Sequence, residues 1–265
     1  MQKKIDVLNV RFDNVTIEET LDYIFDHINR GKKGYLCTPN PEMLLEAERN
    51  HDFKKVLNHS LLNIPDGIGI LWAATHIARK SSKLKAFFTL PLIAFMPSMF
   101  KKILRERVTG SDLMKKIARE AARANKSIFL LGAAEGIAEE TAEKLKKTYT
   151  GLQIAGTYAG SPTPDEEEFI INGINDASPD ILFVAYGAPR QEMWISRNLK
   201  YLNSVKIAIG IGGAFDFIAG KRKRAPKWMQ KLGLEWLFRL IQEPSRWKRI
   251  YNATIKFPTK VIKKL

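Results

Sequence analysis

One carboxylate stands where it could act on a bound substrate. Asp66 follows an apolar stretch at residues 61–64 and Pro65, and a second apolar stretch with helical spacing begins after it. An apolar run that ends at a proline predicts a buried strand, so Asp66 should lie between a strand and a helix. At that edge of a parallel sheet, a carboxylate can take a proton from a hydroxyl. The simpler alternative is that Asp66 only caps the helix, because aspartate is a preferred N-cap residue.

Other polar side chains are predicted at the same edge of the sheet. The sequence contains no Ser or Cys nucleophile motif, no Asp-x-Asp signature of metal-bound nucleotides and no cluster of its four histidines. What remains is rich in amide and guanidinium groups: Thr38, Asn40, Arg107, Asp112, Arg190, Gln191, Glu192 and Asp216. Such a set suits binding a diphosphate and deprotonating a hydroxyl, with neither a cofactor nor a metal ion.

Strand and helix patterns alternate along most of the chain. Thr16 and Glu19 have the spacing of a capping box at the start of a helix that ends at Gly31. This alternation predicts an α/β fold with a Rossmann-like, mostly parallel sheet flanked by helices, followed by a basic helical appendage. The strand patterns lie at residues 5–8, 35–37, 61–64, 128–131, 152–157, 181–186 and 205–209.

Two glycine-rich loops raise the alternative of a nucleotide-dependent oxidoreductase. Residues 132–136 and 210–213 each follow a predicted strand, yet neither completes the G-x-G-x-x-G fingerprint of dinucleotide-binding proteins. Neither is followed by the expected acidic residue. The fingerprint therefore disfavours this alternative, although a helix N-terminus after such a loop can still bind a phosphate.

The positive charge is concentrated in two segments. The 265 residues carry a formal charge of +15, of which residues 79–107 contribute +7 and residues 221–265 contribute +12, so the remainder carries −4. Such a distribution predicts two surfaces that meet an anionic partner. The only cysteine is Cys37, and the sequence has neither an apolar signal peptide nor a run of 18 uncharged apolar residues. These features predict a cytoplasmic protein without a membrane span.

An apolar insertion lies within the first basic segment. Residues 84–102 are rich in Phe, Leu and Met, and Pro91 and Pro97 should interrupt any straight helix there. Fifteen uncharged residues between Lys85 and Lys101 are too few to span a bilayer. Basic residues around a short apolar stretch favour a segment that lies in an anionic membrane surface. The alternative is a segment that is buried or that forms a homo-oligomer interface.

The second basic segment, residues 221–265, is called the tail here. Trp228, Trp236 and Trp247 recur among its Lys and Arg residues, with other apolar residues at helical spacing. This pattern predicts amphipathic helices at a membrane surface, separate from a catalytic domain over residues 1–220. Binding to nucleic acid is the competing use of cations among aromatic residues, and a non-enzymatic binding module remains an alternative. The residues at the sheet edge favour an enzyme, so no nucleic acid partner is expected.

Five motifs follow one another along the chain: Thr38-Pro39-Asn40, Pro65-Asp66-Gly67, the stretch 107–112, the stretch 187–192 and the stretch 212–216. In this order they resemble the signatures of the WecG/TagA/CpsF glycosyltransferases, and the likeness covers nearly the whole chain. In the tail, Arg239, Arg246 and Arg249 resemble a membrane-binding appendage found in the teichoic acid linkage-unit enzymes of that family. The apolar insertion departs from the family pattern.

The resemblance implies an inverting transfer of N-acetylmannosamine from its UDP sugar to the 4-hydroxyl of GlcNAc on undecaprenyl diphosphate. It implies metal-independent catalysis by Asp66, Thr38 and Arg107, on the inner face of the plasma membrane. A UDP-N-acetylmannosaminuronate transferase of the same family is the alternative. Substrate contacts are expected from Asn40, Gly187, Arg190, Gln191, Gly213, Asp216, Arg239, Arg246 and Arg249.

Overall fold

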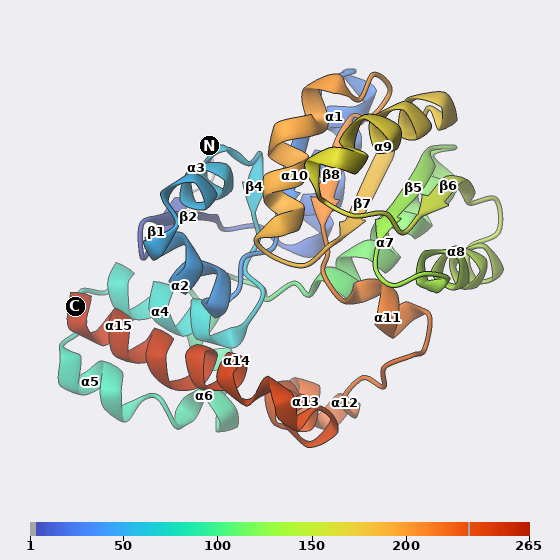
Figure 1. Cartoon of the computed structure of the whole chain (residues 1–265). Helices are drawn as coiled ribbons and strands as arrows, with labels where there is room; N and C mark the ends of the chain where they lie inside the picture. The colour runs from blue at the N-terminus through green and yellow to red at the C-terminus, as the bar shows by residue number, and fades with distance from the viewer. Residues whose placement is uncertain (1–3, 233) are drawn as a thin grey trace.

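A parallel sheet of six strands forms the centre of the molecule (Figure 1). This computed structural model describes residues 4–232 and 234–265. The strand order is β4-β3-β8-β7-β5-β6, and every neighbouring pair is parallel. The predicted α/β class is confirmed. The strands are β3 (Gly34–Cys37), β4 (Leu62–Asn63), β5 (Ser127–Gly132), β6 (Gln153–Tyr158), β7 (Ile181–Ala185) and β8 (Ile207–Gly210).

Helices cover both faces of the sheet, because alternate strand residues are apolar on each face. In β7, Leu182 and Val184 pack into one core cluster, whereas Ile181 and Phe183 pack into the other. The first cluster is closed by α2 (Pro41–Arg49), α3 (His51–His59), α9 (Pro164–Ala177) and α10 (Arg190–Asn198). The second is closed by α1 (Ile17–Asn29), α7 (Gly110–Arg123), α8 (Ile137–Thr148) and α11 (Ala214–Ile218).

The predicted first strand belongs to a separate hairpin. β1 (Lys4–Val7) pairs antiparallel with β2 (Val10–Asp13), which the sequence patterns do not predict, and the turn residues Leu8 and Asn9 have positive φ. Asp13 accepts a hydrogen bond of 2.9 Å from the backbone of Asn63, so the hairpin is tied to β4. The capping box of Thr16 and Glu19 is confirmed by both of its hydrogen bonds.

The apolar insertion folds into short helices that pack on α4 (Ile68–Ala78). They are α5 (Lys83–Phe88), α6 (Leu92–Phe95) and the 3₁₀ helix η1 (Pro97–Phe100), so the prolines interrupt the helix as predicted. Ala86 and Phe100 are buried, and Thr89 bonds the ring nitrogens of Trp72 and His76 at 3.2 and 2.9 Å. The opposite face is exposed and apolar. It presents Leu84, Phe87, Phe88, Met96 and Met99.

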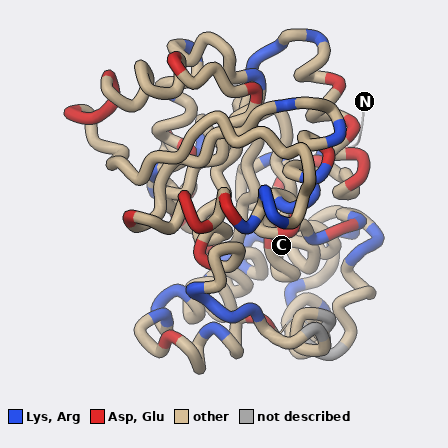
Figure 2. Tube along the Cα trace, turned by 90° about the vertical axis from the view of Figure 1, so that its right-hand side faces the viewer, with Lys and Arg blue, Asp and Glu red and all other residues tan. Residues whose placement is uncertain are grey.

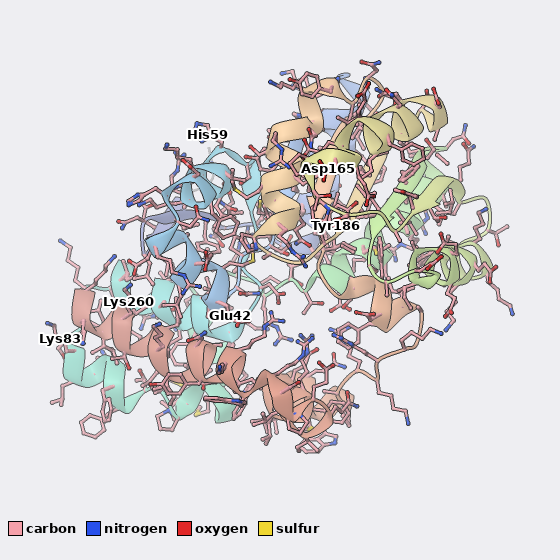
Figure 3. All side chains as sticks on the ribbon, in the orientation of Figure 1. Glu42, His59, Lys83, Asp165, Tyr186 and Lys260 are labelled. Carbon is pink, nitrogen blue, oxygen red and sulfur yellow. The ribbon has the colours of Figure 1, made fainter. Side chains whose placement is uncertain are left out.

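The tail is helical, as predicted, and it packs against the body of the protein. Phe257 and Val261 are buried on α2 and α4, and Glu48 of α2 forms ion pairs with Lys260 and Lys264. Figure 3 labels Lys260 on the last helix of the chain. In Figure 2, Lys and Arg form runs in the lower part of the molecule, where the tail and the insertion lie. The elements of the tail are α12 (Lys227–Lys231), α13 (Glu235–Gln242), η3 (Pro244–Arg246), α14 (Trp247–Tyr251), the π-helical turn η4 (Asn252–Lys256) and α15 (Phe257–Lys264).

No helix within residues 4–232 and 234–265 is long and apolar enough to cross a bilayer.

Candidate active site

Asp66 lies in the loop between β4 and α4, held by backbone bonds on both sides. Its N–H donates to the carbonyl of Pro39 at 3.1 Å, and the carbonyl of Pro65 accepts a bond of 3.0 Å from Val108. The capping alternative is wrong, because Gly67 is the N-cap of α4 and no side chain caps this helix. Gly67 has φ of +132°, a conformation that favours glycine. The carboxylate of Asp66 is therefore free to face a ligand.

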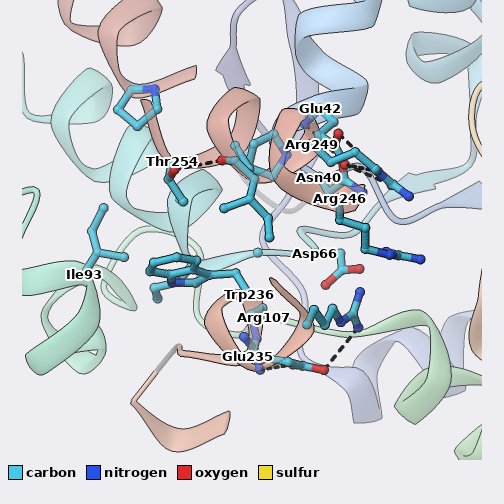
Figure 4. Close-up of a pocket in the computed structure, with 18 of the residues that line it drawn as sticks. Asn40, Glu42, Asp66, Ile93, Arg107, Glu235, Trp236, Arg246, Arg249 and Thr254 are labelled. Atoms are coloured by element: carbon cyan, nitrogen blue, oxygen red, sulfur yellow. Dashed lines mark hydrogen bonds and ion pairs between the residues drawn. The ribbon is translucent and has the colours of Figure 1, made fainter. Parts of the chain in front are cut away.

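A cavity of about 450 Å³ surrounds Asp66 (Figure 4). One side of it comes from the sheet edge, the other side comes from the tail, and the insertion contributes part of the wall. In Figure 4 the Asp66 carboxylate lies between Arg246 and Glu235. The predicted site residues that line the cavity are Asn40, Asp66, Arg107, Arg239, Arg246 and Arg249.

The environment raises the pKa of Asp66 to about 6. Burial is the main cause, because the cavity walls remove water from most sides of a carboxyl that keeps only partial exposure. The guanidiniums of Arg107, Arg239 and Arg224 lower this pKa, and the negative charge of Glu235 raises it. A carboxylate with such a pKa is ionised at neutral pH and is more basic than an ordinary aspartate, as general base catalysis requires.

Glu235 organises the arginines of the cavity. Its carboxylate lies 3.2 Å from Arg239, 3.7 Å from Arg224 and 3.8 Å from Arg107, so it connects the tail to the segment that follows the insertion. Arg224 in turn bonds both carboxylate oxygens of Asp112, at 2.5 and 2.7 Å. Burial alone would raise the pKa of Asp112, but the hydrogen bonds from Arg224 and Thr109 lower it.

The remaining cavity arginines also have carboxylate partners. Arg249 lies 2.9 Å from Glu42 of α2, and Arg246 pairs with Glu243 on the tail itself. Arg239 stacks over the ring of Phe217 at 4.9 Å. These contacts hold the guanidiniums at one end of the cavity, where they can receive an anionic ligand.

Six predicted site residues are absent from the cavity lining. Thr38 is buried at the end of β3, and Asp216 lies 3.7 Å from Arg222. Arg190 donates to the carbonyl of Tyr186 at 2.8 Å. The others, Gly187, Gln191 and Gly213, lie in or beside the loops after β7 and β8.

Gln191 joins those two loops. Its Oε1 accepts hydrogen bonds of 3.0 Å from the backbone of Gly187 and of Gly212, and its Nε2 donates to Glu192 at 2.7 Å. A Cβ on Gly210 would lie 2.7 Å from both Gln191 and Glu192, so any larger residue there would displace these two side chains. Burial raises the pKa of Glu192 to about 7. The structure thus gives Gln191 a bridging role, and its contact with the donor stays a prediction.

The cavity also includes residues that the sequence analysis missed. Glu235 was not among the predicted site residues, although its spacing of four from Arg239 is that of a helical ion pair. No signal marked the insertion as a cavity wall. The missed lining residues include Glu42, Thr109, Glu235, Trp236 and, from the insertion, Leu90, Pro91 and Ile93.

Residues 4–232 and 234–265 contain no group of three or more His, Cys, Asp or Glu side chains that could hold a metal ion. The positively charged side chains in the cavity lining are Arg107, Arg239, Arg246 and Arg249.

Comparisons with known proteins agree with this chemistry. The sequence profile of the glycosyl transferase WecG/TagA/CpsF family matches residues 5–103 and 90–265. A Bacillus subtilis (strain 168) protein is 32% identical over 256 residues, which cover 96% of this chain and 90% of that protein. A Bacillus spizizenii (strain W23) protein is 32% identical over 237 residues, with coverage of 89% and 82%.

Both relatives are named N-acetylglucosaminyldiphosphoundecaprenol N-acetyl-beta-D-mannosaminyltransferase. The profile match spans nearly the whole chain and includes both Asp66 and the tail arginines. The geometry of the cavity and these two likenesses lead to the same conclusion: the protein belongs to the WecG/TagA/CpsF family of glycosyl transferases.

Proposed function

We propose that this glycosyltransferase moves N-acetylmannosamine from UDP-N-acetylmannosamine to the 4-hydroxyl of GlcNAc on undecaprenyl diphosphate, with inversion at the anomeric carbon. The observation that carries the proposal is the position of Asp66, a basic carboxylate in a cavity lined by four arginines. The names of the two relatives supply the sugar and the acceptor.

In this proposal Asp66 is the general base. As the acceptor O4 attacks the anomeric carbon, its proton passes to the Asp66 carboxylate, and the bond from that carbon to the diphosphate oxygen breaks. The electron pair of the broken bond leaves with UDP. A hydroxyl is far too weak an acid to ionise by itself near pH 7, so the base lowers the barrier as the new bond forms.

Arginines and backbone N–H groups supply the positive charge that the two diphosphates require. Arg107 lies beside Asp66 and contributes, with Thr38, to the catalytic centre in this scheme. Arg239, Arg246 and Arg249 bind the acceptor diphosphate at the tail side of the cavity. The loops that carry Gly187, Arg190, Gln191, Gly213 and Asp216 bind the donor, and Asn40 contributes from the start of α2.

The acceptor lipid requires that the enzyme work at a membrane surface. The tail and the insertion place cations beside exposed apolar side chains, among them Phe87, Phe88 and Trp247. Each cation near an anionic bilayer adds on the order of 1 kcal/mol, so the two segments together suffice for peripheral binding on the inner face of the plasma membrane.

Release of UDP tests the proposed reaction. Purified enzyme receives UDP-N-acetylmannosamine, UDP-N-acetylmannosaminuronate or UDP-GlcNAc, with and without a lipid-diphosphate-GlcNAc acceptor. We expect acceptor-dependent release from the first donor only, with no loss of activity in EDTA. Preference for the uronate donor would assign the enzyme to the alternative transferase, and no acceptor-dependent release from any donor would reject the proposal. Restoration by Mg²⁺ after EDTA would reject the metal-independent part.

Vesicle binding tests the membrane contact. The double variant Phe87→Ser/Phe88→Ser should sediment less with anionic vesicles than the parent does, because two exposed rings leave the interface. Phe169→Ser is the matched control, because Phe169 is equally exposed on α9, away from the tail and the insertion. Equal binding of the double variant and the control would show that the insertion does not contact the membrane.

A further inference from the structure

The cavity around Asp66 has two chemically distinct ends. Asp66, Arg246 and Arg249 lie at one end, and Ile93 and Thr254 lie at the other, with Trp236 between them (Figure 4). The first end is charged. Away from the charged residues the lining is mostly apolar, and it includes Leu90, Pro91 and Ile93 from the insertion and Ile250, Ala253 and Pro258 from the tail.

The apolar end presents little hydrogen-bonding capacity. Thr254 is its polar side chain, and the hydroxyl donates to the carbonyl of Ile250 at 2.8 Å within the same helix. That bond leaves the methyl group available to the cavity. An apolar ligand can therefore enter this end without leaving a buried donor unpaired.

The cavity reaches the molecular surface beside the insertion. Pro91 is exposed and Trp236 is 38% exposed, although both line the cavity. The exposed rings of Phe87 and Phe88 lie on α5, directly before Pro91 in the chain. A ligand can thus extend from the arginines, along the apolar end, to an apolar patch of the surface.

We propose that the apolar end is a subsite for the first isoprene units of the acceptor's lipid chain. This inference rests on the proposed function, because the lipid acceptor carries an anionic diphosphate and an apolar chain in one molecule. The acceptor joins a sugar diphosphate to an apolar chain, just as the cavity joins a charged end, which holds Asp66 and the arginines, to an apolar end. A separate apolar ligand would not require the two ends to share a cavity.

Filling the subsite should affect only acceptors with a long chain. Ala253→Phe places a ring in the apolar end, and Ile255→Phe is the matched control, because Ile255 is exposed two residues away and does not line the cavity. Both are assayed in one detergent with GlcNAc diphosphate esters of a polyprenyl chain or a methyl group. We expect Ala253→Phe to lower kcat/KM about tenfold or more for the polyprenyl ester. Its kcat/KM for the methyl ester should stay within about twofold of the control.

Equal losses on the two esters, or no loss on either, would overturn the subsite while leaving the transferase assignment intact. If Ala253→Phe does not fold, as judged by circular dichroism, Ile93→Ser replaces it, because that side chain is only partly buried. The same difference between esters is then expected.

A binding measurement separates this inference from the proposed reaction. A photoactivatable prenyl diphosphate, which needs no transfer to react, should label peptides from residues 90–93 and 250–258. Polyprenyl monophosphate should compete with the label, and a phosphatidylglycerol of similar chain length should not. Labelling elsewhere, or competition by the phospholipid alone, would overturn the subsite. Failure of UDP release with every acceptor would instead reject the proposed function.

Discussion

The two sides of the cavity are positioned by different forces. On the sheet side, the Asp66 loop is fixed by buried backbone hydrogen bonds to Pro39 and Val108. On the tail side, Arg239 and Arg249 are positioned mainly by ion pairs with Glu235 and Glu42. Backbone bonds in a buried loop resist salt, whereas partly exposed ion pairs weaken as salt rises. In the proposed mechanism, the base therefore lies on the rigid side, and the arginines proposed to bind the diphosphate lie on the adaptable side.

The largest effect on turnover is expected from a substitution of Asp66, on the sheet side of the cavity. Asp66→Asn keeps the shape of the side chain and removes the base, so turnover should fall by about 10²- to 10⁴-fold. Affinity for UDP, measured by calorimetry, should change little. Asp26→Asn is the control, because Asp26 pairs with Arg30 on the exposed surface of α1. A folded Asp66→Asn enzyme with turnover near that of the control would remove Asp66 from the mechanism.

The same variant should be more stable than the parent above pH 6. Burial raises the pKa of folded Asp66 to about 6 from an ordinary value of 3.8, so ionisation costs folding free energy once the pH exceeds the unfolded value. The gain should be about 2–3 kcal/mol above pH 6, shrink between pH 6 and 3.8, and vanish below 3.8. Thermal unfolding at pH 7.5 and 3.5 measures it, and equal gains at both values would contradict the raised pKa.

A smaller effect is expected from the tail side. Arg246→Gln/Arg249→Gln should lower kcat/KM for the lipid acceptor about 10- to 100-fold, because two charge-assisted contacts to the diphosphate are lost. UDP affinity should be unchanged. Lys248→Gln is the control, since Lys248 lies between them in sequence and does not line the cavity. If the double variant behaves like Lys248→Gln in detergent, the two arginines contribute only general positive charge.

The smallest effect is expected from a substitution of Glu235, which connects the two sides of the cavity. Glu235 raises the pKa of Asp66, so Glu235→Gln should lower that pKa and move the acidic limb of the pH profile of kcat/KM to lower pH. The sign follows because the base is active when ionised. An acidic limb that moves to higher pH would show that the arginines released from Glu235 no longer face Asp66.

The residues that the sequence predicted best are those whose neighbours in the chain determine their position. Asp66 follows a short apolar run and a proline, which is enough to place it at the end of a strand. Arg246 and Arg249 lie on a tail whose helical spacing and charge are visible in the sequence. For such residues local pattern and position in the fold are closely linked.

Residues whose roles depend on distant partners were predicted less well. Gln191 bridges the loops after β7 and β8, and an amide at the sheet edge has the same sequence signal whether it binds a loop or a ligand. Glu235 pairs with Arg107, which lies more than a hundred residues earlier. The insertion's contribution to the cavity depends on how the tail packs across it, and tertiary packing of this kind is not encoded in local spacing.

The π-helical turn in the tail sets the rotation of the helix that ends the chain. Pro258 has no N–H to donate to a carbonyl one turn earlier, and the π turn at η4 (Asn252–Lys256) precedes it. Within this stretch, Ala253 and Thr254 line the cavity while Phe257 and Val261 enter the core. Deleting one residue would rotate the following turns by about 100°. The cavity wall and the hydrophobic anchor would then point in incompatible directions, so the length of this turn is as constrained as its composition.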